Sequence, residues 1–140
     1  MTSGALAAVL FLGACDALDT DKTPQRARDG ISSLQLSVTG SPTPGSLSAA
    51  EHVLARLQAK DAKGLAKLSL DDGGAEKAAR AWVKEWGDLA QQPMTADFSE
   101  PVKSVWVEVT FKGERRKLSF TLEGKSDSYD DRFGVLLKKD

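Results

Sequence analysis

The period of the apolar residues changes once along this 140-residue chain, from a helical repeat to a strand repeat. Between Ser46 and Gln92, apolar side chains recur at intervals of three and four residues, which is typical of helices with one buried face. From Met94 to Asp140 they recur at every second residue, which is typical of strands with one buried face. Helices followed by strands predict an α+β fold in which the helices cover the apolar face of an antiparallel sheet.

We expect about three helices in the first part. Ser48 and Glu51 form a capping box that would start the first helix, and Asp61 can cap a short second one. The third has the clearest pattern, because spacings of four and three define one apolar face formed by Ala75, Ala79, Trp82, Trp86 and Leu89. Its tryptophans, Trp82 and Trp86, either pack in the core or form a platform on which a ligand stacks.

The second part predicts about four antiparallel strands. A short strand at Met94–Phe98 precedes two longer ones, near residues 105–111 and 117–123, which are joined by a tight turn at Gly113. A last strand covers residues 133–137. Trp106 falls on the face opposite its apolar neighbours. It is therefore either covered by another segment or available to a partner, since exposed tryptophans are frequent binding hot spots.

An uncharged apolar run, Gly4 to Ala14, precedes the only cysteine of the chain, Cys15. As a helix, eleven residues would cross only about half of the ~30 Å hydrocarbon core, which is too short for a membrane span but suits a secretory signal. A signal of this kind usually opens with a basic residue, whereas the first one here is Lys22. One explanation is a start codon upstream of Met1.

The segment Leu12-Gly13-Ala14-Cys15 resembles the lipobox of bacterial lipoproteins. The resemblance implies that residues 1–14 are a signal peptide, that cleavage leaves Cys15 first, and that its thiol carries a diacylglyceryl group. Two or more acyl chains give stable attachment, so we expect a protein anchored on the extracytoplasmic face of the cell membrane. The alternatives are a secretory signal without lipid, or a buried helix with a core thiol.

Residues 15–45 predict a flexible tether, and residues 46–140 a single α+β domain. The tether is rich in charges of alternating sign and in Ser, Gly and Pro, so it can bury little apolar surface. One part of it has another interpretation. Leu34, Leu36 and Val38 alternate with polar residues and could instead form a strand at the edge of the sheet.

Few residues suggest chemistry. His52 is the only histidine and has no clear base or nucleophile partner in the sequence. The oxygen-rich loop with Asp127, Asp130 and Asp131 lacks the residue order of an EF-hand, and no cysteine–histidine cluster has zinc-ligand spacing. We therefore expect no metal and no cofactor. A net charge of −1 gives no reason to expect a nucleic-acid partner.

The predicted turn around Gly113 is strongly basic. Its cations either meet anionic headgroups or wall polymers, or keep the sheet soluble; they are Lys112, Arg115, Arg116 and Lys117.

The order of the elements resembles the nuclear transport factor 2-like, or ketosteroid-isomerase-like, cone fold. Residues 55–65, ARLQAKDAKGL, are similar to its first helix and the turn after it, and residues 81–87, AWVKEWG, are similar to its third helix. The resemblance implies helices packed into a concave sheet with a pocket at the open end. Isomerases of this family use an acidic base and an oxyanion hole of Tyr and protonated Asp, which the inward strand positions lack.

We therefore expect a membrane-anchored extracytoplasmic domain that binds an envelope partner or a small apolar ligand without catalysis. One alternative is a small isomerase- or dehydratase-like enzyme acting on an apolar substrate. The other is a structural or assembly subunit of an envelope complex.

Overall fold

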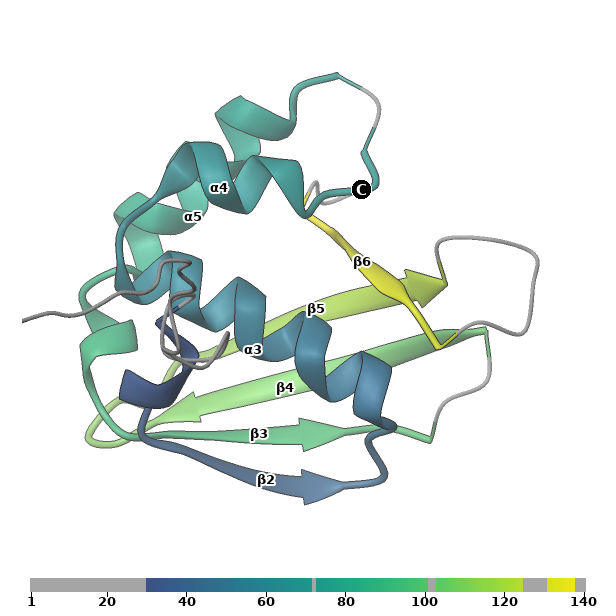
Figure 1. The fold of residues 1–140 in the computed structure, drawn as a ribbon. Coiled ribbons are helices and arrows are strands. Elements are labelled where there is room, and N and C mark those ends of the chain that lie inside the picture. The colour runs from purple at the N-terminus through teal and green to yellow at the C-terminus, as the bar shows by residue number, and fades with distance from the viewer. Residues whose placement is uncertain (1–29, 72, 101–102, 125–130, 138–140) are drawn as a thin grey trace, which may run out of the picture.

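In a computed structural model, three α-helices lie on one face of a five-stranded sheet (Figure 1). The structure describes residues 30–140 except residues 72, 101–102, 125–130 and 138–140. The predicted α+β class is thus confirmed. The elements are η2 (Ile31–Ser33), β2 (Leu36–Gly40), α3 (Pro44–Gln58), α4 (Ala62–Lys67), α5 (Ala75–Trp86), η3 (Leu89–Gln91), β3 (Met94–Phe98), β4 (Ser104–Phe111), β5 (Lys117–Gly124) and β6 (Phe133–Leu136).

The sheet is mixed, with the strand order β2-β3-β4-β5-β6. Strands β3 to β6 form the expected antiparallel meander. Strand β2 is a fifth strand that pairs in parallel with β3, from Leu36 opposite Met94 to Gly40 opposite Phe98. The prediction of four antiparallel strands was therefore incomplete. The three helices that lie between β2 and β3 return the chain to the end of the sheet where β2 began, so the two strands run in the same direction.

The domain begins earlier than the predicted boundary at residue 46, and the described part of the predicted tether belongs to it. Leu34 and Leu36 pack against the core, and the edge-strand interpretation of this segment is the one that the structure shows. Helix α3 starts at Pro44, where Thr43 Oγ1 accepts a hydrogen bond from the Ser46 backbone N–H and Thr43 N–H donates to Ser46 Oγ. The expected start at Ser48 was wrong. Cys15 and the predicted signal peptide lie outside the described residues.

The core lies between the helices and the inner face of the sheet. The alternation seen in the sequence holds in the structure, since Val105, Val107 and Val109 are fully buried while Trp106 is exposed. Leu54 and Leu57 of α3 are fully buried above them. At about 25 cal/mol per Å² of apolar surface removed from water, this continuous layer is the main source of the domain's stability.

Candidate functional site

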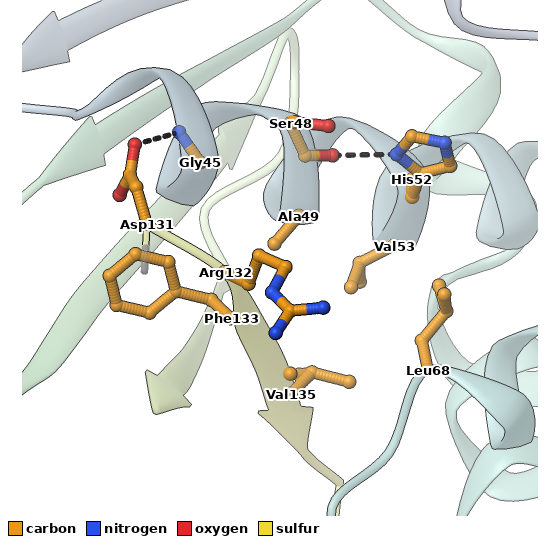
Figure 2. A pocket seen from close by; sticks show the side chains of 11 residues that line it. Gly45, Ser48, Ala49, His52, Val53, Leu68, Asp131, Arg132, Phe133 and Val135 are labelled. Carbon is orange, nitrogen blue, oxygen red and sulfur yellow. Dashed lines mark hydrogen bonds between the residues drawn. The ribbon is translucent and has the colours of Figure 1, made fainter. Parts of the chain in front are cut away.

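A cleft of about 270 Å³ lies between the first half of α3 and strand β6 (Figure 2). One wall is formed by Ala49 and Val53 of α3, and the opposite wall by Phe133 and Val135 of β6. Leu68, just after α4, lines the cleft as well. These five side chains are apolar, and the surface that they leave accessible comes mainly from Ala49, Leu68 and Phe133, because Val53 and Val135 are each only 1% exposed.

Strand β6 is fixed along both of its edges. On one side it pairs with β5, with Val135 opposite Leu122. On the other side the residues after α4 bond to it, because Leu70 N–H donates to Val135 O at 2.9 Å and Val135 N–H donates to Leu68 O at 3.1 Å. The wall of the cleft formed by β6 is therefore held in a defined place, and Leu68 is positioned by the same pair of bonds.

Asp131 connects the start of β6 to the start of α3 and borders the cleft at that end. Its Oδ2 accepts a hydrogen bond from the Gly45 N–H at 2.6 Å, and its Oδ1 accepts one from Thr43 Oγ1 at 2.6 Å (Figure 2 shows the first). A carboxylate at a helix N-terminus is favourable because the helix dipole is positive there. A Cβ at Gly45 would overlap the Asp131 backbone oxygen, so glycine permits this close approach.

Two polar side chains, His52 and Arg132, also line the cleft. His52 Nδ1 lies 2.8 Å from the carbonyl oxygen of Ser48, one helical turn earlier. A carbonyl oxygen can only accept, so Nδ1 is the protonated nitrogen in this contact. Figure 2 shows the guanidinium of Arg132 directed into the space between α3 and β6. Arg132 thus places a cation beside the apolar walls, and it also takes part in an interaction within the chain.

Trp82 and Trp86 lie in the core rather than on a ligand platform, with exposed fractions of 7% and 6%. The indole N–H of Trp82 donates to the Leu137 carbonyl oxygen at 3.0 Å, and its ring lies 6.0 Å from that of Phe120 between centroids. Trp86 stacks on Phe111 at 5.8 Å. Of the two interpretations that the sequence left open, the structure shows core packing.

Trp106 lies on the sheet face opposite the helices and is 55% exposed. Thr121 of β5 is its cross-strand neighbour, and Leu136 of β6 follows in the same row. Within the part of the chain that the structure describes, no helix covers this face of the sheet (Figure 1). The described residues thus leave the Trp106 ring exposed, on a different face of the sheet from the cleft.

The predicted oxygen-rich loop is described only at Asp131, and Asp127 and Asp130 lie outside the described residues. Among the residues that are described, no three His, Cys, Asp or Glu side chains are placed to hold a metal ion together. The helices described here are all too short or too polar to cross a membrane. Cys15, the predicted lipidation site, lies outside the described part.

Sequence reasoning did not identify the cleft. Its walls come from α3 and from β6, which are about eighty residues apart in the chain. The available signals were local and weak: the Thr43-Pro44-Gly45 start of a helix, and an aromatic residue, Phe133, directly after Arg132. Comparisons of the whole chain with protein-family models, with curated proteins and with solved structures found no match.

Proposed function

We propose that this chain is a lipid-anchored extracytoplasmic binding protein whose cleft between α3 and β6 takes a small, mainly apolar ligand without catalysis. The observation that carries the binding part is the cleft itself, with apolar walls and the Arg132 guanidinium directed into it. The anchor part depends on the sequence, where the apolar run Gly4 to Ala14 ends at Cys15.

The polar groups of the cleft support binding more than catalysis. Asp131 uses both carboxylate oxygens to hold the start of α3. A proton-transfer site instead needs an acid or base that is free to reach the substrate.

A relation to the nuclear transport factor 2-like cone remains part of this proposal. The order of three helices before an antiparallel meander supports it, as does the placement of the helices on one face of the sheet. The parallel edge strand β2 differs from the all-antiparallel sheet that the resemblance led us to expect.

A fluorescent probe tests the cleft directly. The probe 1-anilinonaphthalene-8-sulfonate combines an apolar body with one anionic group, which matches the walls and Arg132. We expect saturable binding by the wild-type protein and loss of that binding when Ala49→Trp fills the cleft. The control is Ala81→Trp, the same substitution at an exposed position of α5. Equal binding by both variants would overturn the assignment of the cleft as the site.

Processing tests the anchor. In bacterial cells, we expect the mature protein to carry an acyl mass on Cys15. When globomycin inhibits the lipoprotein signal peptidase, the unprocessed precursor should accumulate instead. Cys15→Ser should remove the acyl mass and leave the chain unprocessed both with and without globomycin. An unmodified chain free in the cytosol would contradict the anchor while leaving the binding experiment unaffected.

Trp106 supports a second function, that of a structural or assembly subunit of an envelope complex. A tryptophan that is 55% exposed, on a sheet face that no described helix covers, is a typical anchor for a protein partner. Cross-linking in membranes followed by purification tests this candidate. If Trp106→Thr abolishes a partner band that Ala49→Trp leaves unchanged, the sheet face is the interface.

A further inference from the structure

The turn between β4 and β5 concentrates positive charge. Residues Lys112 to Lys117, called the basic turn below, contain four cations and one acid, Glu114, and all four cations are exposed. Gly113 has a φ of 80°, which lets the chain reverse within so few residues. The structure therefore presents a compact group of cations at one end of the sheet.

Hydrogen bonds and ion pairs within the domain hold the basic turn in place. Glu114 Oε1 accepts hydrogen bonds from the backbone N–H groups of Arg115 and Arg116 at 2.9 and 3.1 Å. These bonds, together with the Arg116 side chain, hold the pKa of Glu114 below its ordinary value. The Arg116 guanidinium also lies 5.3 Å from the centroid of the Trp86 ring and 3.8 Å from Glu85.

Two cations of the basic turn form ion pairs with described residues and two do not. Arg116 is paired with Glu114 and Glu85, and Lys117 lies 3.6 Å from Glu108. Lys112 and Arg115 form no ion pair with any residue for which the structure gives a position. Their charges are therefore directed to solvent and can act on an external anionic surface.

The basic turn lies at the end of the domain where the chain enters it. Lys112 N–H donates to Pro93 O at 2.9 Å, and Met94 N–H donates to Gln35 O at 2.9 Å. Two hydrogen bonds thus connect the basic turn to the residue just before β2. Figure 1 shows η2 and the β4–β5 turn together at the same end of the sheet, on the left of that view.

The length of the preceding chain limits how the domain can sit on a membrane. Fourteen residues separate Cys15 from Gly30, and they span at most about 50 Å even when fully extended. An acylated Cys15 therefore holds the entry end of the domain within about 50 Å of the bilayer, which is near enough for the basic turn to reach the headgroups. Anionic phospholipids attract Lys and Arg near the surface, with an effect of about five-fold in affinity per charge.

From these observations we propose that the basic turn rests on the anionic headgroups of the membrane that holds the anchor. This inference depends on the proposed acylation of Cys15. The orientation places the cleft away from the bilayer, since the cleft borders the first half of α3 and the entry end lies near its last turn. The fifteen residues of α3 span about 22 Å.

The test uses the acylated full-length protein in vesicles of neutral phosphatidylcholine and in vesicles that also contain phosphatidylglycerol. Amide hydrogen exchange across residues 111–118 is compared between the two. We expect the anionic lipid to slow exchange there, because each contacting charge favours the membrane-bound orientation about five-fold. About 1 M salt should remove the difference, because the Debye length falls to ~3 Å.

Two matched double variants distinguish the charges of the basic turn from positive charge elsewhere on the domain. K112Q/R115Q should lose the slowing, whereas K67Q/K77Q, which removes two exposed cations from α4 and α5, should keep it. Equal exchange in both vesicle types by an acylated wild-type protein overturns the orientation alone. The absence of an acyl mass on Cys15 overturns the anchor, and with it this inference.

Discussion

Replacing Asp131 with Ala removes the contact that joins β6 to the start of α3. The Asp131 carboxylate accepts two hydrogen bonds of 2.6 Å, from Thr43 Oγ1 and from the Gly45 N–H. Hydrogen bonds to a charged group contribute about 1.5–3 kcal/mol, and a carboxylate at a helix N-terminus adds about 0.3–1 kcal/mol. Asp131 is exposed, so the low ends of these ranges apply. We therefore expect the free energy of unfolding to fall by about 2 kcal/mol.

Urea unfolding, followed by tryptophan fluorescence, measures this loss on a chain that begins at Asp16, because the described core is built from residue 31 onward. Asp131→Asn keeps one acceptor oxygen and should lose about half as much. Gly45→Ala should lose a similar amount by another route, because its Cβ would displace the Asp131 backbone. A double-mutant cycle between Thr43→Ala and Asp131→Ala should give a coupling of about 1 kcal/mol.

Two results would refute the reasoning about Asp131. One is a loss below about 0.5 kcal/mol for Asp131→Ala, the range of ordinary surface substitutions. The other is strict additivity in the cycle with Thr43, which would mean that the two side chains act independently. The same variants also report on the cleft, because a displaced start of β6 should weaken probe binding together with stability.

Three further predictions follow from other contacts. Trp82→Phe leaves the buried Leu137 carbonyl without its 3.0 Å bond and should cost about 2 kcal/mol in urea unfolding. The hydrogen bond and charge of Lys60 lower the pKa of Asp88. Lys60→Met should raise that pKa, as measured by NMR titration. In the wild-type protein, the Lys60–Asp88 pair stabilises the fold at pH values above the unfolded-state pKa of Asp88. This stabilisation should disappear as the pH falls through the lower pKa that Asp88 has in the folded state. An unchanged Asp88 pKa would contradict this. Trp106→Thr should change the free energy of unfolding by less than about 0.5 kcal/mol, because the ring is 55% exposed. A larger loss would show that another segment covers the ring in solution.

The sequence predicted those elements whose burial repeats within a few residues. The stripe containing Ala79, Trp82 and Trp86 is buried in α5 as expected. The alternation around Val107 and Val109 is that of β4. In both cases one face of the element packs against the core, so the spacing of apolar residues within a few positions is enough to predict which side chains are buried.

Strand β2 could not be predicted with the same certainty, because its environment is only weakly periodic. Leu36 is half-buried, while every later residue of the strand is exposed, including Val38. Its partner β3 lies 58 residues further along the chain, beyond three helices. No local pattern specifies such a pairing, and the same composition also fits a loop.

The start of α3 shows a competition between two capping signals. Ser48 with Glu51 matches the usual capping box, yet the structure uses Thr43 with Ser46. Pro44 in the first turn favours the earlier start. Asp131, from 86 residues away, adds a bond to the Gly45 N–H that no sequence window contains. The cleft escaped prediction for the same reason, since its walls are assembled from distant segments.

The geometry of α3 ties the two proposals together. Its first half lines the cleft, and its last turn lies beside η2, where Ser33 Oγ donates to Gln58 Oε1 at 3.0 Å. A rigid helix of about 22 Å therefore separates the ligand site from the end at which the chain enters the domain. If the basic turn rests on headgroups, a ligand reaches the cleft from the aqueous side. Charge-removing substitutions in the basic turn should then change the orientation of the domain on the membrane and leave the affinity of the cleft for its probe unchanged.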